Sequence, residues 1–235
     1  MKNIAVILFI SIYSIGFSQD ADAILNRVVT KINSVKDYSV DANIKADIPL
    51  IKILPVKASI YFKQKDKFKV VSKGIAILPK QGFTDVNSFL MKKNSYMAVD
   101  GGVKTINEVK TNLITVIPTN ENSEFVLAKL WIDAKNDLIL KSQITTRSSG
   151  TVTVDYSYGA EAEFGLPNQL VFDIDVKKFK LPKSVAADLN KTEKEKAKKN
   201  KNKDQKGTII IKLTNYKINK GISDDFFKEK NWKII

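Results

Sequence analysis

The stretch LVFDIDVKKF, residues 170–179, alternates apolar and polar side chains. Successive side chains of a β-strand point to opposite faces of the sheet, so this segment is predicted to be a strand with one apolar face. That face carries Leu170, Phe172, Ile174 and Val176. The opposite face carries Val171, Asp173, Asp175 and Lys177. The fold therefore depends on what covers the apolar face: a second sheet, a layer of helices, or something that is not protein.

The same alternation recurs along most of the chain. It predicts about eight strands joined by short connections, which is typical of antiparallel meanders. The other strand segments are 39–48, 56–63, 67–71, 126–133, 138–144, 152–158 and 207–218. In the second meander the apolar face is expected to include Val126, Leu138 and Leu140. Segments 170–179 and 207–218 are expected to be neighbours in the sheet.

One amphipathic helix is predicted before the first strand. Asp20 and Asp22 lie near its start, where carboxylates favour a helix N-terminus. Apolar side chains then recur at helical spacing, at Ile24, Val28, Ile32 and Val35. Such a helix has one face to bury against the rest of the protein.

Residues 74–124 show less regular patterning. They suggest a short strand, a loop and a helix of one or two turns over residues 85–91, with Thr84 as its N-cap. A long segment with little secondary structure in a compact domain is often functional, and a helix that simply fills the core fits equally well.

A sheet with one apolar face must cover that face, because burial stabilises by about 25 cal/mol for each Å² of apolar surface. Two complete sheets would make a sandwich. Here one helix precedes the first meander and another separates the two meanders. This favours an α+β fold: a single curved antiparallel β-sheet, or half-barrel, with helices packed on its concave apolar face. Where helices fill the concave side incompletely, an apolar cavity remains, and an acyl chain suits it.

The first 18 residues have the pattern of a signal peptide. Lys2 precedes an apolar stretch at residues 4–15, and Gly16 and Ser18 provide small side chains for cleavage near Ser18. The apolar stretch is short for a membrane span, although an uncleaved anchor is the alternative. We therefore expect an exported protein with one domain over residues 19–235.

The composition disfavours enzymes and metal sites. Histidine and cysteine are both absent, which excludes Ser-His-Asp catalysis, thiol catalysis and thiolate metal ligands. Asp173 and Asp175 form a carboxylate pair, but on the polar face of a strand rather than in a cleft. No segment has the acidic spacing of a calcium loop. We therefore expect a non-enzymatic binding protein without a cofactor, and a hydrolase is the weakest alternative.

The charge is strongly positive, with 39 basic and 25 acidic residues and a formal net charge of +14. Part of the excess lies in residues 191–206, which hold eight lysines and three acidic residues. This tract has almost no apolar side chains, so a flexible, solvated loop is predicted. A basic surface suits anionic lipid head groups or acidic proteins, whereas nucleic acid is not an expected partner of an exported protein.

The order of these elements resembles the LolA family of outer-membrane lipoprotein carriers. The likeness covers nearly all of residues 19–235 and is carried by degenerate structural segments. They are AILNRVVTKINSVKDYS, KDKFKVVSKG, LWIDAKNDLILKSQIT, LPNQLVFDIDV and NYKINKGISDDFF. The last segment is similar to members from Bacteroidota-like bacteria. The lysine-rich tract and the scarcity of arginine depart from the pattern of the carriers.

The resemblance implies a half-barrel that holds acyl chains in its hollow. Family members carry lipoproteins through the periplasm from an inner-membrane ABC transporter to an outer-membrane acceptor. It would make this chain a periplasmic carrier that touches membrane surfaces transiently, and we expect it to be a monomer. In carriers of this family an arginine helps to hold the lid closed; this chain has Arg27 on its first helix and Arg147 at a turn.

The hollow is expected to be lined by inward side chains of the strands. These candidate lipid-binding residues are Ile44, Ile60, Phe62, Val70, Leu130, Leu140, Val154, Phe172, Ile174 and Ile211. The candidate lid residues are Phe83, Phe89 and Leu90. Taken singly, each residue fits an ordinary core position. The alternative function is a non-enzymatic envelope sensor or scaffold of the same fold, which would act through its basic surface.

Overall fold

The computed structural model describes residues 20–49, 53–65, 67–74, 76, 78–79, 89–92, 94–148, 150–175 and 206–228. The predicted signal peptide lies outside these residues. So do Phe83, Val176, most of the predicted helix over 85–91, and the lysine-rich tract up to residue 205.

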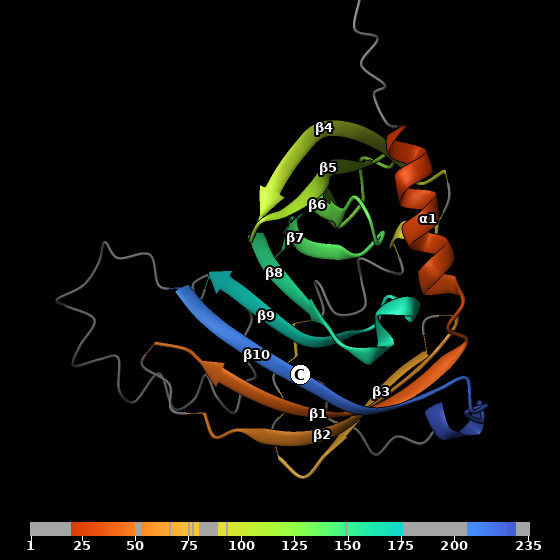
Figure 1. Cartoon of the computed structure of the whole chain (residues 1–235). Coiled ribbons are helices and arrows are strands. Elements are labelled where there is room, and N and C mark those ends of the chain that lie inside the picture. Colours follow the sequence, from red (N-terminus) through yellow and green to blue (C-terminus); the bar gives the residue numbers. More distant parts are fainter. Residues whose placement is uncertain are drawn as a thin grey trace, which may run out of the picture.

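The protein contains one open sheet of ten strands, and every neighbouring pair is antiparallel. The strands are β1 (Asp37–Asp47), β2 (Val56–Lys63), β3 (Lys67–Ser72), β4 (Tyr96–Ile106), β5 (Val109–Pro118), β6 (Phe125–Asp133), β7 (Ile139–Thr146), β8 (Gly150–Tyr158), β9 (Pro167–Asp175) and β10 (Lys206–Ile218). Their order across the sheet is β3-β2-β1-β10-β9-β8-β7-β6-β5-β4. The sheet curves so that β3 and β4 lie at opposite ends of an arc (Figure 1). The α+β prediction of a single curved antiparallel sheet is confirmed.

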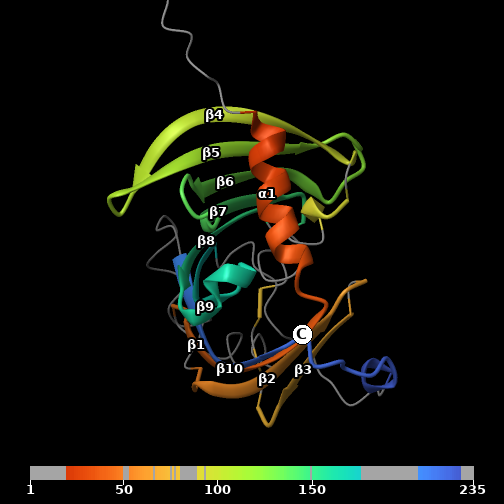
Figure 2. The ribbon, with the colours of Figure 1, turned by 45° about the vertical axis from the view of Figure 1, so that its right-hand side comes forward.

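The helix α1 (Ala21–Asn33) crosses the open side of this arc (Figure 2). Asp20 caps it, because the Asp20 carboxylate accepts a hydrogen bond from the backbone N–H of Asp22 at 3.0 Å. Its buried face includes Ile24, Leu25 and Val28. The predicted amphipathic helix is confirmed, and it packs on the concave side of the sheet. Among the described residues, no helix combines the length and apolar character needed to cross a bilayer.

The core lies on the concave face and forms two clusters. The first cluster joins inward side chains of β1, β2, β3, β8, β9 and β10 around Phe172, which is fully buried. The second cluster packs α1, Phe89 and Leu90 against inward side chains of β5, β6 and β7. The strand β9 alternates as predicted: Leu170, Phe172 and Ile174 are buried, and Asp173 is exposed. The neighbouring position of β9 and β10 is also confirmed.

The irregular character expected for residues 74–124 is wrong for much of that range. The strands β4 and β5 form a hairpin there, which raises the strand count from about eight to ten. The hairpin turns at Asn107 and Glu108, both of which have positive φ, as a two-residue turn requires. Most of β4 is exposed, so its sequence lacks the alternation that revealed the other strands.

The outer strand β4 is also irregular. Its pairing with β5 shifts register between Asp100 and Val103. Gly102 has φ +76° and donates its backbone N–H to the Asp100 carboxylate at 2.8 Å. This arrangement is a β-bulge, and the positive φ explains why a glycine occupies the position.

Two apolar positions of the second meander differ from the prediction. Val126, expected on the apolar face, is 40% exposed. The β6–β7 pairing shifts register near Ile132, so that Ile132 lies opposite Ile139. Leu138 and Ile139 are buried as a result, whereas Leu140 is only half-buried and belongs to neither core cluster.

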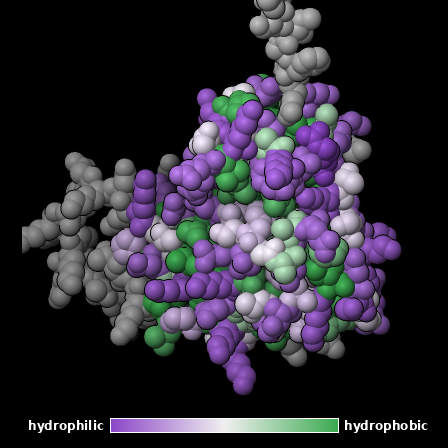
Figure 3. Space-filling view, viewed as in Figure 1, coloured by the Kyte–Doolittle hydropathy of each residue, from purple (hydrophilic) through white to green (hydrophobic). Residues whose placement is uncertain are grey.

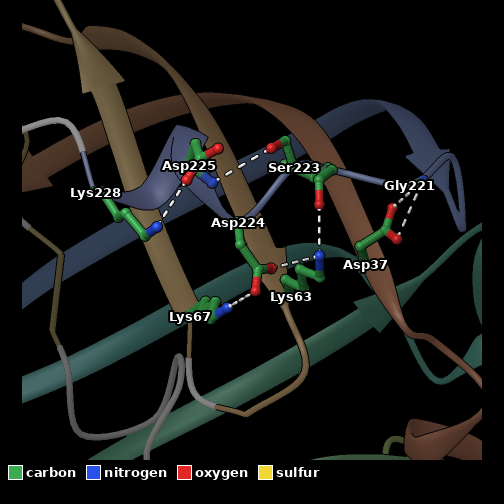
Figure 4. Close-up of polar contacts among 9 residues, drawn as sticks. Asp37, Lys63, Lys67, Gly221, Ser223, Asp224, Asp225 and Lys228 are labelled. Atoms are coloured by element: carbon green, nitrogen blue, oxygen red, sulfur yellow. Dashed lines mark hydrogen bonds and ion pairs between the residues drawn. The ribbon is translucent and has the colours of Figure 1, made fainter.

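After β10, residues 219–228 lie against β1, β2 and the edge strand β3 (Figure 4). The Asp224 carboxylate pairs with the ammonium groups of Lys63 at 2.6 Å and Lys67 at 2.5 Å. Hydrogen bonds from these two lysines lower the pKa of Asp224 to about 2. The short helix η2 (Asp225–Phe227) follows.

Candidate ligand-binding cavity

A cavity lies between the C-terminal half of α1, the helix η1 (Ala160–Phe164) and the concave face of the sheet. Its volume is about 70 Å³, several times the roughly 10–15 Å³ that one water molecule needs. The wall consists mainly of apolar and aromatic side chains. It is formed by Val28, Lys31, Ile32, Val35, Tyr38, Phe62, Asp137, Leu138, Ile139, Tyr156, Tyr158, Phe164, Gly165, Leu166, Pro167, Leu170, Leu213 and Tyr216.

Four tyrosines give this wall its polar character. The Tyr158 hydroxyl donates to the backbone carbonyl of Ile139 at 2.8 Å, and the Tyr216 hydroxyl donates to that of Pro167 at 2.8 Å. The Tyr156 hydroxyl lies 3.0 Å from the Ser142 hydroxyl. Tyr38 stacks on Phe62, with ring centroids 5.2 Å apart. A buried tyrosine hydroxyl needs a hydrogen-bond partner, and three of these four hydroxyls have one within the protein.

Burial keeps these tyrosines protonated. It raises the pKa of Tyr156 to about 12. It also raises the pKa of Tyr38, Tyr158 and Tyr216 well above the ordinary value of a tyrosine. Because the charged form of a buried group is disfavoured, the phenols remain neutral at physiological pH. The aromatic part of the cavity therefore carries no charge.

The charged side chains of the wall are engaged in contacts that connect α1 to the β6–β7 turn. The Arg27 guanidinium pairs with the Asp137 carboxylate at 3.0 Å. The Lys31 ammonium donates to the Asn136 carbonyl at 2.6 Å. Arg147, the other arginine, instead donates to the backbone carbonyls of Glu121 and Ser123. Of the two arginines, Arg27 is the one that links α1 to the β6–β7 turn.

The β6–β7 turn is organised by Asp133, which is 7% exposed. Its carboxylate accepts hydrogen bonds from the backbone N–H of Lys135 at 2.8 Å and the side-chain amide of Asn136 at 2.7 Å. These bonds position the Asn136 carbonyl and the Asp137 carboxylate towards α1. The helix is thus held over the cavity through a turn that one buried carboxylate shapes.

The predicted cavity residues occupy four kinds of position: the cavity wall, the first core cluster, the second core cluster, and neither cluster. Phe62 lines the cavity. Most of the others lie in the first core cluster, namely Ile44, Ile60, Val70, Val154, Phe172, Ile174 and Ile211. Leu130 lies in the second cluster with the proposed lid residues Phe89 and Leu90. Leu140 is in neither cluster, and Phe83 lies outside the described residues.

Strand alternation identifies inward residues but not the place where helices leave space. The cavity opens beside the end of α1 and beside η1, and no strand pattern reports the position of those helices. The tyrosines were the signal available in the sequence. Tyr38, Tyr156, Tyr158 and Tyr216 occupy inward-facing strand positions, where a hydroxyl needs a polar partner.

No cluster of three or more acidic side chains that could hold a metal ion occurs among the described residues. Asp173 is exposed on the outer face of β9 and accepts a 3.3 Å hydrogen bond from Thr208. In the view of Figure 3, hydrophilic side chains dominate the surface and hydrophobic ones form small separate groups.

No protein-family model and no curated protein matches this chain. Solved structures do share its fold. A domain described as an outer membrane lipoprotein-sorting protein from Vibrio parahaemolyticus has 10% identity and a TM-score of 0.55, covering 88% of this chain and 97% of the other. A DUF1329 family protein from Desulfovibrio piger has 11% identity and a TM-score of 0.53, covering 88% and 96%. A LolA superfamily protein from Nitrosomonas europaea has 10% identity and a TM-score of 0.51, covering 90% and 99%. At such identities these similarities establish the fold alone.

Proposed function

We propose that this chain is a non-enzymatic carrier that binds the acyl chains of lipids or lipoproteins in the cavity beneath α1. The observation that carries the proposal is a largely apolar cavity between a helix and the concave face of an open sheet. Binding there requires only the burial of apolar surface and no catalytic step. Each buried CH₂ group contributes roughly 0.8 kcal/mol, so an acyl chain supplies ample driving force.

Binding a whole acyl chain requires the cavity to enlarge, because about 70 Å³ accommodates only part of one. The contacts that hold α1 suit such a movement. The Arg27–Asp137 pair is partly exposed, with 48% and 24% of the two side chains accessible. Exposed ion pairs stabilise only slightly, so this pair adds little to the cost of moving the helix. The apolar burial of the ligand would have to offset the lost burial of Ile24, Leu25 and Val28.

The cellular setting is part of the same proposal. The signal peptide predicted for residues 1–18 supports export to the periplasm, and the fold shared with a lipoprotein-sorting domain supports transport toward the outer membrane. An inner-membrane ABC transporter and an outer-membrane acceptor would then be the donor and the recipient of the cargo. The chain would act as a monomer and touch membrane surfaces only transiently.

Two measurements test the carrier function. Native mass spectrometry of protein purified from a bacterial envelope without detergent should show an added mass that matches a lipid. The purified protein should also bind a fluorescent fatty acid analogue. Val28→Phe places a ring in the cavity and should weaken binding, whereas Val126→Phe adds the same ring at an exposed position and should not. Protein with neither bound lipid nor probe affinity would contradict the proposal.

The alternative function is a sensor or scaffold that acts through its basic surface. The eight lysines of residues 191–206 favour this alternative. Deleting residues 191–205 separates the two functions and retains Lys206, the first residue of β10. A carrier should keep its affinity for the fluorescent probe within about twofold, because the cavity is built from other residues. Loss of partner binding with the probe affinity intact would instead favour the scaffold.

A further inference from the structure

One of the four cavity tyrosines differs from the other three. The hydroxyls of Tyr156, Tyr158 and Tyr216 each have a hydrogen-bond partner within the protein. The Tyr38 hydroxyl has none in the part of the chain that the structure describes. Tyr38 nevertheless lines the cavity, near the start of β1 and on the same strand face as Val40.

The position of the Tyr38 ring is well defined by its neighbours. The ring stacks on Phe62 at 5.2 Å with an interplanar angle of 25°. It also meets Tyr216 edge to face at 5.7 Å with an angle of 62°. Two aromatic contacts on one ring restrict its rotation, so its hydroxyl is held in place before any ligand arrives. A donor held in place binds an acceptor without a further cost in side-chain entropy.

An unpaired hydroxyl in an apolar cavity is a donor that needs an acceptor. Burial raises the pKa of Tyr38, so the phenol keeps its proton. While the cavity is open, water can satisfy the hydroxyl. A purely hydrocarbon ligand that excludes this water leaves the donor unsatisfied, which costs free energy, whereas an oxygen atom on the ligand restores the hydrogen bond.

We propose that the Tyr38 hydroxyl is a specificity-determining group that donates a hydrogen bond to a carboxyl or ester oxygen at the polar end of an acyl ligand. This inference rests on the proposed carrier function and adds which ligands the cavity prefers. Acyl chains that bring an oxygen into the cavity bind more tightly than hydrocarbons of equal length. The selective part of the site is then the cluster of Tyr38, Phe62 and Tyr216, rather than the apolar residues alone.

The test compares three ligands of the same chain length in displacement of a fluorescent fatty acid probe: decanoic acid, methyl decanoate and decane. Tyr38→Phe removes one hydroxyl. It should weaken binding of the acid and the ester about five- to tenfold, the effect of one lost hydrogen bond. Binding of decane should not weaken and should become tighter, because the donor that decane leaves unsatisfied is gone. A loss for the acid alone assigns the acceptor to a free carboxylate, and a loss for the ester alone assigns it to esterified chains.

Tyr216→Phe is the matched control. It deletes the same atom from the same cavity, but that hydroxyl is already committed to the Pro167 carbonyl. This variant should have a lower melting temperature and an unchanged preference for the acid and ester over decane. Tyr38→Phe should melt like the wild-type protein, since no internal hydrogen bond is lost.

Two results would overturn the inference about Tyr38. One is an equal loss of affinity for all three ligands in Tyr38→Phe, and the other is no loss for any of them. Failure of the wild-type protein to bind any ligand is a different result, which contradicts the carrier function itself.

Discussion

Replacement of Phe172 by alanine should lower the free energy of unfolding by about 3–5 kcal/mol, the usual cost of removing a fully buried ring. Phe172 is 0% exposed and belongs to the first core cluster. Its strand, β9, pairs with β8 and β10, so that Phe172 lies opposite Val154 and Ile209. The neighbouring side chains come from ordered strands on both sides, and these can collapse only partly into the space left behind.

Urea denaturation monitored by tryptophan fluorescence or circular dichroism would measure this loss. The matched control is Asp173→Ala, which changes the next residue on the exposed face of the same strand. It should alter the free energy of unfolding by less than about 0.5 kcal/mol. A Phe172→Ala variant as stable as this control would mean that the concave face is not the stabilising core.

The second large effect is expected at Asp133. Asp133→Ala should lower the free energy of unfolding by about 2–3 kcal/mol, because hydrogen bonds to a charged group contribute more than neutral ones. Asp133 is 7% exposed, and its carboxylate accepts hydrogen bonds from Lys135 and Asn136. Its loss leaves the β6–β7 turn without the bonds that shape it. The same turn holds α1, so hydrogen exchange in the helix should also accelerate.

The effect of Asp133 should depend on pH. Burial alone would raise the pKa of this carboxyl group, but hydrogen bonds from Lys135 and Asn136 outweigh burial and lower it. A carboxylate with a depressed pKa in the folded state stabilises the protein above its unfolded value of about 3.9. That contribution disappears as the pH falls through the folded pKa. The stability difference between wild type and Asp133→Ala should therefore be full at pH 7 and shrink below about pH 4.

Asp155→Ala is a suitable control for both the stability loss at pH 7 and its pH dependence. Asp155 is 44% exposed and pairs with Lys141 at 3.2 Å on the outer surface. An exposed ion pair of this kind contributes less than about 1 kcal/mol. If Asp133→Ala and Asp155→Ala lost equal stability at pH 7, the turn would not have the structural role described above.

Strand alternation predicted the fold well where one face of a strand is buried and the other is wet. On β9, and on β10 up to Leu213, alternation identified the inward apolar residues, because a single period holds there. A register shift between Thr214 and Lys217 then turns Tyr216 inward, which alternation does not predict. The hairpin of β4 and β5 was not predicted, because β4 is exposed on both faces for much of its length and therefore lacks alternation. The misplacement of Leu140 has another cause: the register shift near Ile132 moves the strand by one residue, and sequence alone does not reveal such a shift.

The cavity was harder to predict than the fold. Its wall combines α1, η1 and several strands that are far apart in the sequence, and its position depends on where those helices stop. Seven of the ten predicted lining residues belong to the first core cluster, so alternation had located the core rather than the space within it. The inward tyrosines were the only sequence signal of the cavity. An aliphatic residue in the packed core has the same sequence pattern as one in the cavity wall.

The bulge at Asp100–Val103 has a consequence for the protein at high concentration. An exposed terminal strand normally offers a straight row of unpaired backbone groups on which another chain can assemble. Here the kink at Gly102 breaks that row near its middle, and Asp100 and Lys104 place a charge on either side of the break. A second molecule is therefore expected to pair poorly along β4, which disfavours edge-to-edge growth into fibrils.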